Sequence, residues 1–185
     1  MVDEGLAEAD IRMRGAVRAF EDDLASIRTG RATPALVDKL QIDYYGTPTP
    51  LMQLATISAP EPRLLTVRPF DPATLKDIER AILASDLGLT PNNDGKLIRL
   101  NIPPLTEERR HDLVRLVRNR AEEARVAIRN VRRDVLKDIR EFEREKLISE
   151  DELHRGEDEL QKLTDSFVEE INEIGEKKET EVLEE

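Results

Sequence analysis

Hydrophobic residues recur mostly at steps of three or four in three long stretches of the chain, within residues 3–28, 106–147 and 149–184. On an α-helix this spacing gathers the hydrophobic side chains on one face, so each stretch predicts a long amphipathic helix. We expect the three helices to bury these faces against each other as an antiparallel bundle. The seam residues are Leu6, Ala9, Met13, Ala16, Phe20, Leu24 and Ile27; Leu113, Val117, Ala121, Ala124, Ile128, Val131, Val135, Ile139 and Phe142; and Leu153, Leu160, Leu163, Phe167, Ile171 and Ile174.

The ends of the predicted helices carry local signals. Gly30 suits the C′ position that follows a helix, so it predicts the end of the first helix. Thr106, followed by two glutamates, is typical of an N-cap with an acidic first turn. Ser149 opens a capping box at the start of the third helix. Gly156 and Gly175 should each weaken that helix by about 1 kcal/mol relative to alanine.

Residues 31–104 have a different pattern, in which prolines are concentrated and hydrophobic residues alternate with polar ones. Gly46–Pro50 is expected to turn the chain, and Asp71 with Pro72 opens a short helix that ends near Gly88. The predicted strands are Leu40–Tyr44, Leu54–Ile57, Leu64–Val67 and Ile98–Ile102. The sequence therefore predicts an α+β fold. Residues 1–30 and 105–185 form the long antiparallel three-helix bundle, and residues 31–104 form an inserted small β/α/β domain.

The net charge of −11 hides an uneven distribution along the chain. Residues 149–185 hold 4 basic and 15 acidic residues, whereas residues 106–148 hold 13 basic and 10 acidic residues. The arginines of the second helix gather beside its hydrophobic face. We define the arginine ridge as Arg110, Arg118, Arg125, Arg129, Arg132 and Arg133.

Two interpretations of the arginine ridge are open. The planar guanidinium fork suits phosphate, which favours contact with a nucleic acid. Alternatively, the ridge forms salt bridges within the protein, to the acidic third helix or along its own helix. Glu122 can reach Arg118 and Arg125, but it is the only acidic residue three or four positions from Arg125, Arg129, Arg132 or Arg133.

The chain lacks the residues on which most kinds of enzyme catalysis depend. There is no cysteine, which excludes disulfides, thiolate catalysis and cysteine-based zinc sites. The two histidines, His111 and His154, have no second histidine four residues away to form a metal pair, and Thr29–Thr33 lacks the pattern of a phosphate-binding loop. We therefore expect no enzyme activity, no cofactor and no metal site. No window approaches 18 consecutive apolar residues and the N-terminus lacks a signal peptide, so we expect a cytoplasmic protein without a membrane span.

Six segments, spread in order along nearly the full length, closely resemble the bacterial ribosome recycling factor family. They are Ile27–Ala32, Asp43–Leu51, Ala84–Leu89, Pro103–Arg110, Ile128–Arg133 and Gln161–Asp165. The resemblance implies an L-shaped molecule that binds the post-termination ribosome. With elongation factor G and GTP it would split the ribosome into subunits, releasing mRNA and tRNA. It also implies that arginines matching Arg110, Arg129 and Arg132 contact large-subunit ribosomal RNA.

The two chain crossings between the bundle and the inserted domain suggest how the protein moves. Gly30 and Arg31 form one crossing, and Pro103 and Pro104 form the other, so we expect a hinge at these four residues. The protein itself would hydrolyse nothing, because GTP chemistry belongs to its partner, and we expect it to act as a monomer. The alternative function is a coiled-coil scaffold or chaperone that holds proteins through its hydrophobic seam or its small domain.

Overall fold

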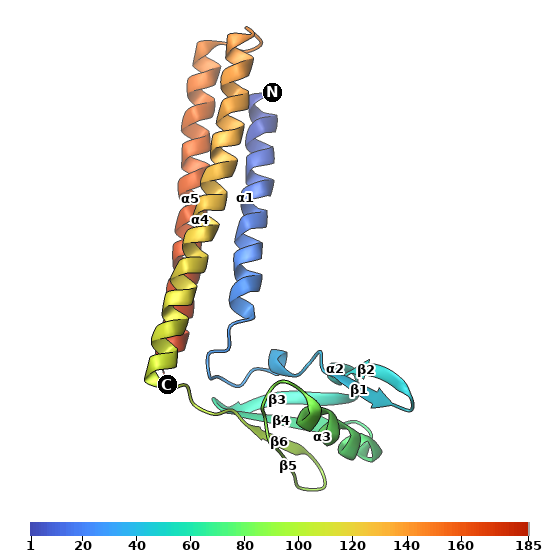
Figure 1. Cartoon of the computed structure of the whole chain (residues 1–185). Helices are drawn as coiled ribbons and strands as arrows, with labels where there is room; N and C mark the ends of the chain where they lie inside the picture. The colour runs from blue at the N-terminus through green and yellow to red at the C-terminus, as the bar shows by residue number, and fades with distance from the viewer. Residues whose placement is uncertain (185) are drawn as a thin grey trace. The chain divides into compact units, whose positions relative to one another are not determined.

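The hydrophobic seams lie on three long helices in the computed structural model, which describes residues 1–184 (Figure 1). Helix α1 spans Val2–Ala25, α4 spans Glu107–Arg144 and α5 spans Glu150–Leu183. The chain runs along α4 in the direction opposite to α1 and α5, and each helix contacts the other two. The predicted antiparallel three-helix bundle is therefore confirmed.

The seam residues form the hydrophobic core of this bundle, in which Met13, Ile128 and Ile171 are fully buried. Gly156 of α5 is part of the packing, because a Cβ atom there would lie 2.9 Å from Cγ1 of Val2 and 3.5 Å from Cγ2 of Ile139. A Cβ separation below about 3 Å is sterically unacceptable, so glycine lets α5 approach α1 and α4 closely at this level. The glycine that costs helix propensity thus permits close packing.

The end of α1 differs from the prediction. The helix ends at Ala25, where the Ser26 hydroxyl donates to the Asp23 carbonyl (2.6 Å) and the Ile27 N–H donates to the Leu24 carbonyl (3.1 Å). These local bonds satisfy carbonyls of the last turn. The prediction that Gly30 is the C′ residue is therefore wrong.

Helix α4 also ends earlier than predicted, at Arg144 rather than at Leu147. Lys146 has a φ of 60° and its N–H donates to the Glu143 carbonyl at 2.9 Å, while the Leu147 N–H donates to the Phe142 carbonyl at 2.9 Å. This pair of bonds is a Schellman motif, which usually places glycine where Lys146 lies. Because a lysine occupies this position, no residue type in the segment indicates that the helix ends here.

The predicted capping box at the start of α5 is confirmed. The Ser149 N–H donates to Oε2 of Glu152 at 2.8 Å, and the Glu152 N–H donates to Oγ of Ser149 at 3.2 Å. Hydrogen bonds from Ser149 lower the pKa of the Glu152 carboxyl. The backbone N–H makes the larger contribution and the hydroxyl the smaller one.

The chain divides into two compact units, Met1–Thr29 with Glu107–Glu185, and Gly30–Thr106. The second unit contains a two-stranded hairpin of β1 (Gln41–Tyr44) and β2 (Thr47–Pro50). Its antiparallel sheet has the order β3-β4-β6-β5. The sheet strands are β3 (Ala55–Glu61), β4 (Leu64–Pro69), β5 (Pro91–Asn93) and β6 (Ile98–Asn101), and the helices are α2 (Leu51–Leu54) and α3 (Leu75–Ala84), with 3₁₀ turns at Pro34–Leu36 and Pro72–Thr74.

The second unit has its own hydrophobic core, and α3 contacts both β1 and β5. Asp71 starts the helical segment as predicted, because its Oδ1 accepts the Ala73 N–H at 3.0 Å. The fully buried residues include Ile42, Leu51, Leu65, Val67, Ile78, Ile82, Ile98 and Leu100. The structure confirms the α+β class, with long helices and a small β-containing unit.

Three details of the second unit correct the sequence prediction. The expected turn at Gly46–Pro50 is mostly strand, because Thr47–Pro50 pairs with β1 and only Tyr45 and Gly46 reverse the chain. Prolines are acceptable there because β2 is an edge strand that pairs on one side only. Leu54 belongs to α2 rather than to a strand, and the short strand β5 was missed.

Two kinds of feature are absent from residues 1–184. No helix in this range combines the length and the apolar character needed to cross a membrane. Within the same range, no cluster of three or more histidine, cysteine, aspartate or glutamate side chains is arranged to hold a metal ion.

Candidate nucleic-acid interface

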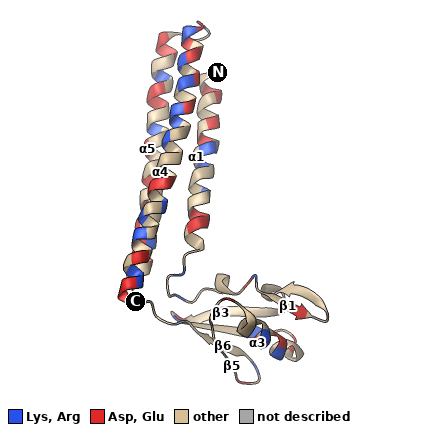
Figure 2. Ribbon diagram, viewed as in Figure 1, with Lys and Arg blue, Asp and Glu red and all other residues tan. Residues whose placement is uncertain are grey.

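The arginine ridge lies on α4, where basic and acidic residues are mixed along the bundle (Figure 2). Arg110, in the first turn of α4, is half-buried and has an interaction partner within the protein. The five other ridge arginines follow along the helix. Their partners differ, so the ridge is not uniform.

Arg118 is bound to the third helix. Its Nε and Nη2 atoms donate to Oε1 and Oε2 of Glu179 on α5, at 2.9 and 3.2 Å. This bidentate hydrogen-bonded pair raises the pKa of Arg118 further above its usual value. Glu122, which the sequence could place near Arg118, binds other arginines instead. For Arg118, the salt bridge to the acidic third helix that the sequence left open is therefore present.

Glu122 lies between Arg125 and Arg129. Its Oε2 accepts a hydrogen bond from Nε of Arg125 at 3.0 Å, and its Oε1 accepts one from Nη1 of Arg129 at 3.1 Å. These two bonds lower the pKa of the Glu122 carboxyl, and the bond from Arg125 contributes more than the bond from Arg129. Nη1 of Arg125 also donates to Oδ1 of Asn172 on α5 at 2.9 Å. One carboxylate thus orients two guanidinium groups on the helix surface.

The end of the ridge has no acidic partner. Among residues 1–184, Arg132 makes no hydrogen bond or ion pair, and Arg133 donates to Oδ1 of Asn130 on its own helix. Neither side chain has a carboxylate oxygen within 4.0 Å in that range. Arg132 is half-buried and Arg133 is exposed. Two cationic groups are therefore left without a carboxylate partner in the part of the chain that the structure describes.

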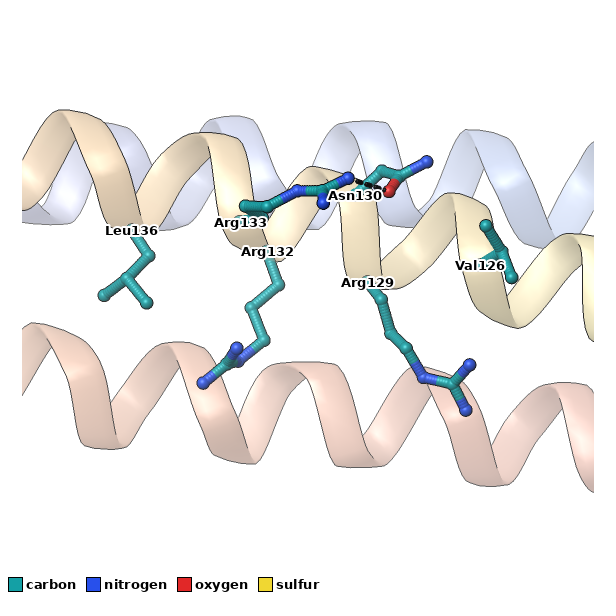
Figure 3. Close-up of a pocket in the computed structure, with 6 residues that line it drawn as sticks. All are labelled: Val126, Arg129, Asn130, Arg132, Arg133 and Leu136. Atoms are coloured by element: carbon teal, nitrogen blue, oxygen red, sulfur yellow. Dashed lines mark hydrogen bonds between the residues drawn. The ribbon is translucent and has the colours of Figure 1, made fainter.

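These arginines surround a hollow of about 360 Å³ on α4 (Figure 3). Arg129 and Arg132 point to the same side, toward α5, while Arg133 lies beside Asn130. The hollow is lined by Val126, Arg129, Asn130, Arg132, Arg133 and Leu136. Guanidinium groups with an amide can bind phosphate oxygens through several N–H donors, and the two apolar residues can contact a sugar or a base.

The sequence predicted three of these six residues, Arg129, Arg132 and Arg133, and missed the others. Asn130 lies three positions before Arg133 and orients it, a spacing that could have revealed the pair. Val126 is 43% exposed, which is unusual for a residue so close to a hydrophobic seam. The bridging role of Glu122 was missed because Arg129 lies seven residues away.

The four expected hinge residues lie at the ends of the second unit's chain. Gly30 has a φ of +78°, and a Cβ there would lie 3.1 Å from Cγ of Leu105, so the two crossings come together. The Ala32 N–H donates to the Pro62 carbonyl at 2.7 Å, and the Ile102 N–H donates to the Arg63 carbonyl at 2.8 Å. Both crossings are thus held by the turn between β3 and β4. Arg31, Pro103 and Pro104 are exposed and lie outside helices and strands.

The sequence model described as "Ribosome recycling factor" matches residues 20–183. The chain belongs to the ribosome recycling factor family. It is 55% identical over 183 residues to the ribosome-recycling factor of Carboxydothermus hydrogenoformans, covering 99% of each chain. It is 57% identical over 179 residues to that of Rubrobacter xylanophilus, covering 97% of this chain and 96% of the other. The family consists of non-enzymatic translation factors, which confirms that the chain is not an enzyme.

Two solved structures of the family are similar to this chain over nearly its whole length. A solution structure of the ribosome recycling factor has a TM-score of 0.78 and 43% identity, covering 98% of this chain and 97% of that chain. The other comprises models for the T. thermophilus ribosome recycling factor and the E. coli elongation factor G bound to the E. coli post-termination complex. Its TM-score is 0.66 with 50% identity, covering 99% of each chain. The recycling of ribosomes is thus the process in which this family acts.

Proposed function

We propose that the protein binds the post-termination ribosome in the cytoplasm as a monomer. With elongation factor G and GTP, it dissociates the ribosome into subunits and releases mRNA and tRNA. Membership of the family supports this function, as does the relative that was solved with elongation factor G on a post-termination complex. The protein supplies binding surfaces and motion, while its partner supplies GTP hydrolysis.

The end of the arginine ridge is the proposed anchor on large-subunit ribosomal RNA. The observation that carries this assignment is the hollow in which, among residues 1–184, Arg132 has no partner and Arg133 has only Asn130. A guanidinium already paired with a carboxylate must exchange one anion for another, whereas these two gain a phosphate at no such cost. Arg129 and Arg125 join the contact by exchanging Glu122 for phosphate, and Arg110 extends it toward the start of α4. Arg118, the remaining member of the arginine ridge, stays paired with Glu179 and contributes little.

The second part of the proposal is a hinge at Gly30, Arg31, Pro103 and Pro104. The hydrogen bonds from Ala32 and Ile102 to the β3–β4 turn tie both crossings to the sheet of the second unit. Rotation would then be confined to the short segments outside these bonds, and the sheet would move as one body. Such motion of the second unit, driven by elongation factor G, would disrupt the contacts between ribosomal subunits.

A cross-linked variant tests the hinge directly. Because the chain has no cysteine, one cysteine introduced into each unit forms a unique disulfide pair. We expect the oxidised protein to bind ribosomes as the wild type does but to lose subunit splitting, measured by light scattering with elongation factor G and GTP. Reduction by dithiothreitol should restore splitting in the same sample. Full splitting by the oxidised protein would show that motion between the units is not required.

We also propose that the two units are separately folding domains, since each has its own hydrophobic core. Replacing residues 31–104 by a short glycine–serine linker should leave a helical bundle with cooperative thermal unfolding, measured by circular dichroism. A deletion product without helical structure would contradict this. The same product should still bind ribosomes but should not split them.

A further inference from the structure

The hairpin of β1 and β2 carries a tyrosine at a position that disfavours it. Tyr44 pairs with Thr47, so Tyr45 and Gly46 form a two-residue loop in which both have positive φ, 51° and 84°. Such loops prefer asparagine or aspartate before glycine, because a bulky side chain is unfavourable in the left-handed region. A strained residue that persists in a fold points to a use for its side chain.

The Tyr45 ring is also unusually exposed. Tyr45 is 78% exposed and Phe70 is 67% exposed, in a chain of which only 3% is aromatic. Burial is the usual reason for keeping an aromatic residue, and it does not apply to these two. The remaining aromatic side chains are half-buried or buried: Tyr44, Phe142, Phe20 and Phe167.

The tip of the hairpin is tied to the segment that carries Phe70. The Tyr45 hydroxyl donates a hydrogen bond to Oδ2 of Asp71 at 3.4 Å, and Asp71 follows Phe70 directly in the chain. The Tyr44 ring supports Tyr45 edge-on, with the two ring centroids 4.7 Å apart. The hairpin tip therefore meets the end of β4. We define the aromatic–acidic patch as Tyr45, Phe70, Asp43 and Asp71.

The charge of this patch is negative. The Asp43 carboxylate accepts the Gly46 N–H at 2.8 Å, and Oδ1 of Asp71 accepts the Ala73 N–H, but neither carboxylate has a lysine or arginine partner within 4.0 Å among residues 1–184. The Asp71 carboxylate, with smaller contributions from Tyr44 and Asp77, raises the pKa of Tyr45. Asp77, by contrast, has a nearby cation, Arg80 at 3.9 Å. Phosphate groups would be repelled here, and cations attracted.

We propose that the aromatic–acidic patch docks on a lysine- or arginine-rich segment of a ribosomal protein. This inference rests on the proposed function, which brings the chain to the ribosome. Ribosomal RNA is the poorer occupant, because its phosphates would face two carboxylates without cationic neighbours. Proteins that bind RNA expose lysine and arginine, and such a cation can lie over the Tyr45 ring while it pairs with Asp71. The second unit thus contacts protein while α4 contacts RNA.

Photo-crosslinking from position 45 identifies the occupant. Tyr45 is replaced by p-benzoyl-phenylalanine, and the variant is irradiated with purified ribosomes, with and without elongation factor G. We expect a cross-link to a lysine- or arginine-rich peptide of a ribosomal protein in both samples. A cross-link to RNA, one to elongation factor G alone, or none from a variant that sediments with ribosomes would overturn the inference. If ribosomes do not bind the wild-type protein, the proposed function fails, and this inference with it.

Three substitutions measure the contribution of the patch. Tyr45→Asn removes the ring but keeps a residue that suits positive φ, so the melting temperature should not fall. It should weaken ribosome binding about three- to tenfold, the range of a cation–aromatic contact. Tyr45→Phe should stay within about twofold of the wild type because the ring remains. Leu83→Ala, which trims a 60% exposed residue of α3, is the matched control and should also stay within about twofold.

Salt dependence separates this contact from the arginine ridge. Tyr45→Asn should leave the slope of log affinity against log salt unchanged, because no phosphate contact is lost. Unchanged affinity of Tyr45→Asn would overturn the inference, and so would a flatter slope, which would indicate phosphate at the patch.

Discussion

The two ends of the arginine ridge place the same residue type in different surroundings. Arg118 is neutralised by Glu179 of α5, whereas Arg132, four helical turns further along α4, has no partner among residues 1–184. Between them, Arg125 and Arg129 share Glu122. An arginine stripe on a helix is therefore not uniform, because the neighbouring carboxylates determine which guanidinium groups remain available to an anion from outside the protein.

The largest expected effect belongs to the unpartnered end. Arg132→Ala should weaken ribosome binding by about 1–3 kcal/mol, the scale of a lost charge-assisted contact. It should also reduce the slope of log affinity against log salt by about one unit, because one phosphate contact is lost. Both are measured by sedimentation binding at several salt concentrations. The melting temperature should hardly change.

Arg144→Ala is the matched control, since Arg144 is an exposed arginine at the end of the same helix and outside the hollow. It should leave ribosome affinity within about twofold of the wild type. A large fall in the melting temperature of Arg132→Ala, with unchanged affinity, would assign Arg132 to the structural role. Affinity that barely responds to salt in the wild type would favour the scaffold or chaperone function instead.

An intermediate effect is expected where two arginines share one carboxylate. Glu122→Gln removes the negative charge that competes with phosphate for Arg125 and Arg129. Ribosome affinity should rise a few-fold at low salt, and its salt dependence should become steeper because two cations are released. Equilibrium binding at low and high salt measures both. Weaker binding would show instead that Glu122 is needed to orient the arginines.

A smaller effect is expected at the neutralised end. Arg118→Ala should leave ribosome affinity within about twofold, because Glu179 already occupies its guanidinium, and should lower the melting temperature slightly. Thermal unfolding and sedimentation binding of the same preparation provide the two values. A loss of affinity as large as that of Arg132→Ala would mean that phosphate displaces Glu179, and the two ends would be equivalent.

The smallest effect is a dependence of stability on acid. Arg125 and Arg129 lower the pKa of the Glu122 carboxyl below its usual value of 4.5. The ionised carboxylate therefore stabilises the folded state above about pH 4.5. This contribution is lost as the pH falls through the lowered pKa. When the pH falls from about 5 to about 3, the melting temperature of the wild type should therefore fall slightly more than that of Glu122→Gln. Equal losses would show that the pairing adds nothing to stability.

The three-helix bundle could be predicted because its signals are local. The seam period defined the helices, and the Ser149 capping box defined the start of α5. The strand β2 could not be predicted, since it depends on pairing with β1. The end of α4 at Lys146 could not be predicted either, since lysine is a residue type that rarely ends a helix. The L-shaped arrangement stays a prediction.

The candidate site was predictable in its residue types but not in its pairing. The sequence placed Arg129, Arg132 and Arg133 on one helix. It could not show that Glu179, 61 residues from Arg118, would neutralise that arginine, because the register of α5 against α4 depends on the packing of the whole bundle. Nor could it place Tyr45 beside Asp71, since these residues lie 26 positions apart and meet through the fold of the small unit.

The close packing of Val2 on Gly156 has a consequence for the synthesis of the chain. The contact joins Val2, near the start of the chain, to Gly156 in the second turn of α5, so this packing cannot form until the start of α5 has left the translating ribosome. The second unit, by contrast, is one continuous segment, Gly30–Thr106, that is complete long before α5 is made. Domains fold as their residues emerge, and contacts distant in sequence form late. We therefore expect the small unit to fold first and α1 to wait, unpaired, for its helical partners.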